Sequence, residues 1–241
     1  MHESELWITK LFNDYLAGFG NSILGMAGMA HEARPWANFI VMQILVALIL
    51  VAIFPLLRVR LSTDRPGKLQ QIFELVYEFI YGQAVDQVGH EAKQYVSFFG
   101  TLFLFILTSN MIGLIPAFES PTMNASVTAG CAVATFVYYH LMGVIANGPK
   151  YALHFAGPLW WLAPLMIPIE VISHLARVLS LTVRLYANMF AGEQVTMVFL
   201  SLTKVAAFVF MGLHVFVGVV QAYIFMLLAM VYVGGAVSHE H

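Results

Sequence analysis

A long uncharged run near the end of the chain limits what it can fold into. From Val205 to His239 the sequence contains no Asp, Glu, Lys or Arg. The whole chain follows this trend, since 60% of its 241 residues are hydrophobic and 10% are charged, whereas roughly a quarter of the residues of a soluble domain are charged. Long apolar runs need the hydrocarbon of a bilayer around them. The sequence therefore predicts an all-α integral membrane protein.

Charge balance and missing motifs argue against several other classes. Lys and Arg number 11 against 13 Asp and Glu, and the net charge of -2 provides no basic field for nucleic acid. The sequence has no Gly-rich phosphate loop, HExxH or CxxC, so we expect neither a metal nor a cofactor. Cys131 is the single cysteine and cannot form an internal disulfide. The first residues, MHESELWITKLFNDYL, do not resemble a secretory signal, and we expect insertion through later spans.

The first predicted span covers residues 36–57, and the densest basic cluster of the chain follows it. This cluster contains Arg58, Arg60, Arg65 and Lys68. Because basic flanks favour the cytoplasmic side, residues 58–94 are expected to form an inner loop and residues 1–35 an outer segment. The inner loop contains PGKLQQIFELVYEFIYGQ, whose apolar residues follow helical spacing. This amphipathic helix is expected to lie flat on the cytoplasmic interface or to pack on the protein's own spans.

Further spans and a terminal hairpin complete the expected set of about five membrane helices. Residues 95–146 hold the second and third spans, and residues 147–160 form a second inner loop. Residues 161–241 form two long helices joined near Lys204, with the C-terminus in the cytoplasm. The first of them has room for about 40 residues, or roughly 60 Å, against a hydrocarbon core of about 30 Å. It must break near Pro164 and Pro168 or lie steeply inclined as a tilted hairpin.

Polar residues gather on one stripe of this helix within otherwise apolar sequence. At 3.6 residues per turn they fall on one side, and Leu, Val and Met occupy the rest. A charged side chain at bilayer depth costs at least about 2.5–3.5 kcal/mol on insertion scales, so it normally faces a partner or a water-filled cavity. We interpret the stripe as the functional surface; it contains Glu170, His174, Arg177, Leu181, Arg184 and Asn188, with Ser173 and Ser180 beside it.

Arg184 is the strongest single candidate in this stripe. Its guanidinium stays protonated at any attainable pH, so it cannot relay protons, but it can hold a carboxylate ionised or repel a cation. Asn188 lies one helical turn further on and is placed to orient it. Two structural roles stay open for Arg184: reaching the membrane interface, or pairing with Glu170 or Glu193.

Ionisable and amide residues on both terminal helices are candidates for moving protons. Glu170 and Glu193 lie about 35 Å apart along one helix, on either side of Arg184, and each can carry a proton or simply sit in water at a helix end. His214 and Gln221 share one face of the last helix, and they contribute only if that face meets the stripe. Four other polar residues are expected to hydrogen-bond between helices: Ser109, Asn110, His140 and His154.

Several segments resemble one known family. They are LSLTVRLYANMFAGE at residues 179–193, PIE before it, AYIFMLLAMVYV after Gln221, and PGKLQQIFELVYEFI in the first inner loop. In this order they resemble subunit a of the F-type rotary ATP synthase, over most of the chain beyond residue 35. The resemblance implies a stationary, non-catalytic subunit in a bacterial inner membrane. Its partners would be a rotating ring of hairpin subunits c, the peripheral stalk subunit b, the soluble ATPase sector and lipid.

The resemblance also implies roles for individual residues, without choosing between protons and sodium. Arg184 matches the arginine that faces a ring carboxylate. Five residues match positions associated with two aqueous half-channels: Glu170, Asn188, Glu193, His214 and Gln221. The secondary candidates are Ser173, His174 and Arg177.

One departure from the family concerns the outer entrance. After the second span, family members often carry an acid in the segment that reads PTMNASVT here, where Asn124 takes its place. We expect Glu119 to substitute for the acid, beside Asn124.

The alternative function is a self-contained secondary transporter in which Arg184 binds an anionic substrate, although the internal repeat typical of transporters is not visible. A membrane anchor would leave Arg177 and Arg184 without a role.

Overall fold

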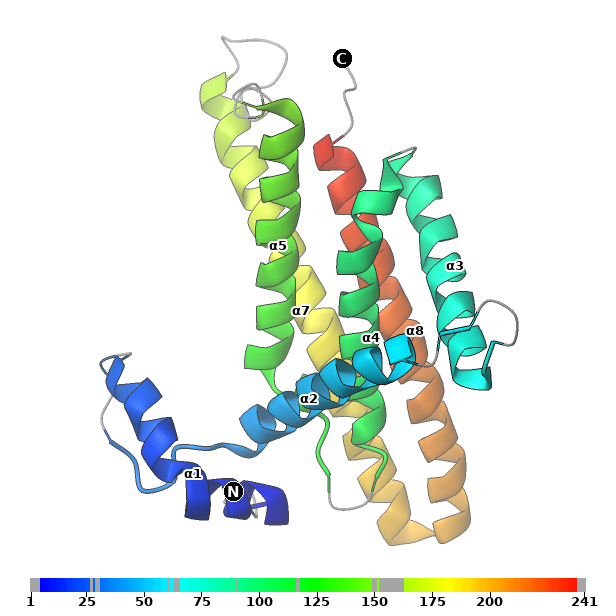
Figure 1. Cartoon of the computed structure of the whole chain (residues 1–241). Helices are drawn as coiled ribbons and strands as arrows, with labels where there is room; N and C mark the ends of the chain where they lie inside the picture. Colours follow the sequence, from blue (N-terminus) through cyan, green and yellow to red (C-terminus); the bar gives the residue numbers. More distant parts are fainter. Residues whose placement is uncertain are drawn as a thin grey trace.

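The structure, a computed structural model, describes residues 5–26, 28, 31–59, 61–62, 66–89, 91–115, 118–148, 151 and 163–237. Every regular element in these ranges is a helix, so the predicted all-α fold is confirmed (Figure 1). In chain order the elements are α1 (Trp7–Met26), α2 (Asn38–Val59), α3 (Lys68–Val88), the 3₁₀ helix η1 (Ala92–Gln94), α4 (Val96–Ile112), the 3₁₀ helix η2 (Pro121–Met123), α5 (Ala125–Asn147), α7 (Ala163–Leu202) and α8 (Lys204–Val237).

Four of these helices are long and apolar enough to cross a bilayer. The qualifying stretches are Asn38–Pro55, Ala125–Asn147, Pro164–Leu202 and Phe208–Val237, and Val96–Ile112 is a shorter apolar helix. These five helices are apolar on most sides, as helices surrounded by protein and lipid must be. The chain is therefore a multi-pass membrane protein.

The α7–α8 hairpin is the centre of the fold. Only Thr203 separates the two helices in sequence, and they pack against each other, with α5 against both and α4 against α8. The fully buried side chains between these helices are large and apolar. They include Phe99 and Ile106 of α4, Leu185 and Met189 of α7, and Phe225 and Met230 of α8.

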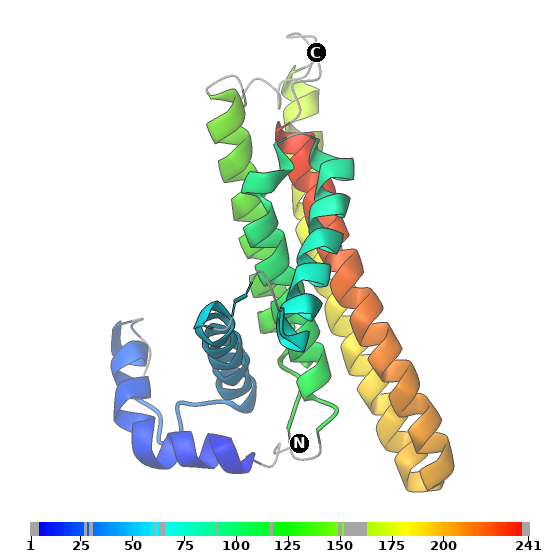
Figure 2. The ribbon, with the colours of Figure 1, turned by 45° about the vertical axis from the view of Figure 1, so that its right-hand side comes forward.

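α7 is one helix of 40 residues that continues through Pro168. The break near Pro164 and Pro168 that the sequence left open is therefore not present in α7. At 1.5 Å per residue α7 is about 60 Å long, whereas the 22 residues of α2 give about 33 Å, close to the hydrocarbon thickness. Figure 2 shows α2 strongly foreshortened while α7 and α8 extend across the view. The hairpin thus runs across the direction of α2.

α3 packs along α4 and α8 and lies beside them in both views (Figures 1 and 2). Ile80 and Ala84 form its buried face. Gly234 allows the close approach of α8, because a Cβ at that position would overlap the carbonyl oxygen of Gln87. The amphipathic helix therefore packs on the protein's own helices, which is one of the two arrangements expected from the sequence. On its outer side it exposes further apolar residues, among them Leu69, Ile72 and Leu75.

The N-terminal part of the chain contains a helix that was not predicted. α1 covers 20 residues within the segment 1–35, which the sequence suggested only as an outer segment. Its start is tied to α2, because the backbone N–H of Leu6 donates to Oδ1 of Asn38 at 3.2 Å. A row of large apolar residues at intervals of four, from Trp7 to Ile23, was the available indication of a helix.

Candidate functional site

The polar side chains singled out on the hairpin lie in two groups with Arg184 between them. The first group surrounds Glu170 near the start of α7, and the second surrounds Glu193 nearer its end. From the helical rise, Arg184 is about 21 Å from Glu170 and about 14 Å from Glu193 along the axis. Each group is completed by side chains from other elements of the fold.

The Glu170 group lines a cavity of about 280 Å³ between α5, α7 and α8. Burial is the main cause that raises the pKa of the Tyr151 hydroxyl above its ordinary value, so this group stays protonated. A polar cavity of this size has room for several water molecules. The polar side chains that line it are Tyr139, Tyr151, Glu170, His174, Arg177 and Tyr232.

Within this cavity a histidine joins a tyrosine to a carboxylate. His174 Nδ1 lies 2.6 Å from the Tyr139 hydroxyl, and its Nε2 lies 3.2 Å from Glu170 Oε1. The ring of His140 lies 4.8 Å from that of His174. Because an imidazole can take up a proton on one nitrogen while it releases one from the other, His174 can pass a proton between Glu170 and the interior. Arg177 lies over the ring of Tyr232, 5.5 Å from its centroid, as a cation–π contact.

Arg184 is half-buried at the edge of the packed face of α7. Among the described residues it has no hydrogen bond and no ion pair. The structural alternative, a pair between Arg184 and Glu170 or Glu193, is therefore absent from this structure. A permanent cation remains next to the apolar surface of the helix without a counter-ion from the described part of its own chain.

The Glu193 group lies where α7 and α8 approach each other closely. A Cβ at residue 192 would come 2.5 Å from Nδ1 of His214, so Gly192 is needed for this approach. Glu119, in the segment before η2, is an electrostatic neighbour of Glu193. The structure thus brings Glu119, Glu193 and His214 to one part of the hairpin.

An amide pair lies between this group and Arg184. Asn188 Nδ2 donates to Gln221 Oε1 at 2.7 Å. Gln221 is buried, and its Nε2 has no hydrogen-bond partner among the described residues. His214 and Gln221 therefore both face α7, which is the condition on which their expected contribution depended.

Two residues that the sequence did not single out contact the candidates directly. Asn38 Nδ2 donates to Oε1 of Glu119 at 3.4 Å, which joins the start of α2 to the Glu193 group. Tyr139 holds His174, as described above. Asn38 could have been noticed as an amide at the start of an apolar run, whereas nothing in the sequence pairs Tyr139 with a residue 35 positions away.

The remaining candidates have more local contacts. Asn124 is the N-cap of α5, where its Oδ1 accepts from the backbone N–H of Ser126 at 2.9 Å. Ser173 is half-buried and makes no hydrogen bond within the described ranges. Asn110 Nδ2 donates to the carbonyl oxygen of Gly218 at 2.9 Å, so the predicted hydrogen bond between helices is confirmed for this residue.

The prediction of a hydrogen bond between helices is not confirmed for the other three residues, Ser109, His140 and His154. Ser109 Oγ has no partner in the described part of the chain. His140 Nδ1 lies 3.0 Å from the carbonyl oxygen of Phe136 in its own helix. His154 lies outside the described residues.

Fold and site together define a class of protein. It is a helical multi-pass membrane protein. Its longest helix carries an arginine that has no partner among the described residues and lies between two groups of ionisable side chains. Comparison with known proteins gives the family: the family described as ATP synthase A chain matches residues 40–234. The chain belongs to this family and is a membrane-sector subunit of ATP synthase. This membership does not favour the alternative of a self-contained secondary transporter.

Relatives that bear the name ATP synthase subunit a are similar over nearly their whole length. The protein of Solibacter usitatus is 64% identical over 233 residues, which cover 96% of this chain and 100% of the relative. The protein of Koribacter versatilis is 46% identical over 241 residues, 98% of each chain. The protein of Desulfosudis oleivorans is 39% identical over 216 residues, 89% of this chain and 93% of the relative.

The bond between Tyr139 and His174 gives a test of the cavity. Tyr139→Phe removes the hydroxyl and leaves a buried imidazole nitrogen without this partner, so we expect the protein purified in detergent to lose about 1–3 kcal/mol of stability. Thermal unfolding followed by circular dichroism measures the loss as a lower melting temperature. Tyr138→Phe is the matched control, because the neighbouring Tyr138 ring stacks on Phe98 at 3.6 Å and its hydroxyl has no hydrogen bond within the described ranges. Equal effects of the two substitutions would contradict the assigned bond.

Proposed function

We propose that this chain is the stationary subunit of the proton-translocating sector of a rotary ATP synthase in a bacterial inner membrane, and that it catalyses no reaction by itself. The observation that carries the proposal is Arg184, unpaired among the described residues and flanked on one helix by two proton-exchanging groups. A fixed cation in that position separates two routes for a mobile cation. Both groups contain Glu and His side chains, which can exchange protons, and this favours the proton as the transported ion.

The two groups form the two half-channels. The basic cluster after α2 supports a cytoplasmic position for the C-terminal end of this helix and an outer position for its N-terminal end. Asn38, at the outer end of α2, contacts Glu119. The group of Glu119 and Glu193 therefore opens to the outside, with Asn188, His214 and Gln221 leading inward from it. The group of Glu170 and His174 opens to the cytoplasm, where the C-terminus also lies.

The inclination of the hairpin explains why a rotating partner is needed. If α2 stands upright, α7 and α8 run closer to the membrane plane, because they lie across its direction (Figure 2). Much of the roughly 35 Å between Glu170 and Glu193 then lies along the membrane rather than through it. A proton that enters at one group must be carried sideways to reach the other. A ring of hairpin subunits with one carboxylate each provides this lateral transport.

The surface beside Arg184 suits close contact with such a ring. Only 11% of the apolar stretch Pro164–Leu202 is buried by the chain itself, so most of it is available to lipid or another subunit. Small residues at the contact let helices of different subunits approach closely. Four exposed residues on the same side of α7 as Arg184 are small: Ala176, Ser180, Ala187 and Ala191.

The mechanism follows from the cost of charge in lipid. A proton from the outer group neutralises a ring carboxylate, which can then turn into the hydrocarbon without carrying a buried charge. A carboxylate that arrives from the other direction releases its proton through the Glu170 group and is held ionised by Arg184. One charge crossing the membrane supplies about 2.3 kcal/mol per 100 mV, so several protons are needed for each ATP. The peripheral stalk subunit b and the soluble ATPase sector complete the expected partners.

Removal of the fixed cation tests the proposal. Arg184→Ala should abolish ATP-driven proton pumping, because the arriving carboxylate loses its counter-charge and the two half-channels are no longer separated. Acidification of inverted vesicles, followed by the quenching of an acridine dye, measures the pumping. Lys93→Ala removes an exposed cation of η1 and serves as the control. Vesicles with Arg184→Ala that acidify normally would reject the role.

The outer entrance is tested separately at Glu119. Glu119→Gln keeps the shape of the side chain but cannot release a proton, so we expect ATP synthesis driven by an imposed proton gradient to fall by about 10²-fold, the low end of what a positioned proton carrier contributes. Glu32→Gln is the control, because this carboxylate is exposed in the loop between α1 and α2, at the outer end of the protein. Unchanged synthesis with Glu119→Gln would show that another residue admits the proton.

A further inference from the structure

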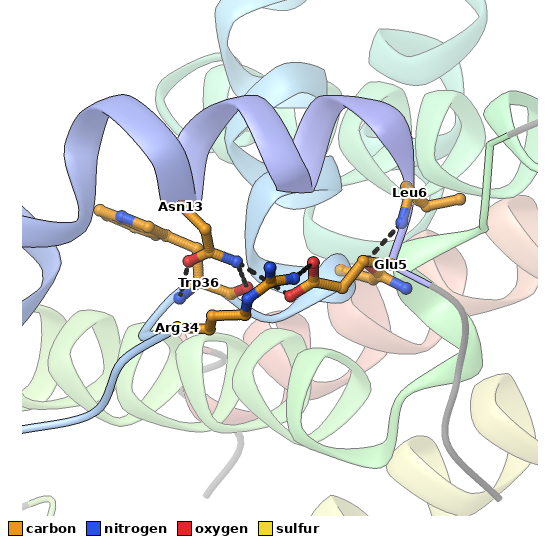
Figure 3. Close-up of polar contacts among 6 residues, drawn as sticks. Glu5, Leu6, Asn13, Arg34 and Trp36 are labelled. Atoms are coloured by element: carbon orange, nitrogen blue, oxygen red, sulfur yellow. Dashed lines mark hydrogen bonds and ion pairs between the residues drawn. The ribbon is translucent and has the colours of Figure 1, made fainter.

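α1 turns its polar side toward the rest of the protein. Its buried residues are Thr9, Asn13 and Gly20. Asn13 exchanges two hydrogen bonds with the backbone of Trp36: its Oδ1 accepts from the N–H at 3.0 Å, and its Nδ2 donates to the carbonyl oxygen at 3.1 Å (Figure 3). At Gly20 a Cβ would come 2.7 Å from Cγ of Pro35. The polar face is therefore fixed to the residues that lead into α2.

The other side of α1 exposes a row of large apolar side chains. Trp7, Leu11, Tyr15, Phe19 and Ile23 follow one another at intervals of four residues, and each is between 47% and 81% exposed. Such side chains gain roughly 1.5–3 kcal/mol each when they leave water. A helix with its polar face inward and its apolar face outward is inverted relative to a helix on a water-soluble protein. It requires an apolar surrounding.

The position of α1 identifies this surrounding as lipid. The start of α2, a membrane-spanning stretch, bonds to the start of α1 through Asn38. In Figure 2 α1 is bent, and both of its parts extend in the plane of the view while α2 is foreshortened, so α1 lies across the end of a span. That end is at the level of the membrane–water interface, where Trp and Tyr are enriched and amphipathic helices lie in the plane.

We infer that α1 is a lipid-binding helix whose apolar row enters the acyl chains of the leaflet at the N-terminal end of α2. The charged residues of α1 are one Lys and one Asp, Lys10 and Asp14, so the helix has no excess of positive charge for anionic headgroups. Its affinity comes from apolar area, and it should not depend on headgroup charge. The inference concerns lipid contact alone and does not require the proton path proposed above.

Single cysteines in the apolar row and on the flank of α1 test the inference in the complete ATP synthase. Leu11→Cys and Tyr15→Cys replace exposed residues of the apolar row, and Lys10→Cys is the control on the flank of the same helix. Each variant is labelled with an environment-sensitive fluorophore and reconstituted into phosphatidylcholine vesicles. Cys131 is buried, so the parent protein supplies the background.

We expect the labels at residues 11 and 15 to emit at shorter wavelength than the label at residue 10. Lipids brominated near the headgroup end of the acyl chains should quench the first two labels strongly and the third weakly. Replacing part of the phosphatidylcholine with phosphatidylglycerol should change neither result. Emission at the wavelength typical of water from the labels at residues 11 and 15 would overturn the inference. Short-wavelength emission from these labels that brominated lipid does not quench would also overturn it, and would identify a protein partner on this face.

Discussion

The rest of the structure depends on one constraint, an arginine in apolar surroundings. This arginine has no partner among the described residues of its own chain. The guanidinium of Arg184 cannot lose its proton, so its cost at membrane depth has to be offset by water or by a counter-ion. Glu170 is in contact with His174 instead. We propose that the chain leaves Arg184 for a group that another subunit brings, with proton-exchanging side chains on either side.

The long hairpin holds Arg184 and the two groups of ionisable side chains in a fixed arrangement. Because α7 is continuous over 40 residues, the two groups and the arginine are held at fixed spacing on one rigid rod. Gly192 lets α8 approach α7 closely, so that His214 and Gln221 reach the polar side of α7. α5 contributes Tyr139, and α2 contributes Asn38. The hairpin carries the candidate site, while the other helices position and complete it.

Much of this could be predicted from sequence because membrane helices are set by length and hydropathy. The apolar runs indicated the spans, and the charges within them indicated Glu170, Arg184 and Glu193. Continuity of α7 through Pro168 could not be predicted, since proline favours a break in water but is tolerated within a membrane bundle. α1 was missed although its apolar residues at intervals of four, from Trp7 to Ile23, indicate a helix; its inverted orientation is not encoded in that spacing. The contacts of Tyr139 and Asn38 depend on tertiary packing, which spacing along one helix does not encode.

The most direct test of the central claim is a crosslink between this chain and the ring. Ala187 is exposed beside Arg184 on α7, and Val137 is exposed on a different helix, α5. Ala187→Cys, paired with a cysteine next to the membrane carboxylate of the small hairpin subunit, should form a disulfide in the assembled enzyme, whereas Val137→Cys should not. A disulfide from residue 137 with none from residue 187 would contradict the claim that Arg184 faces the ring.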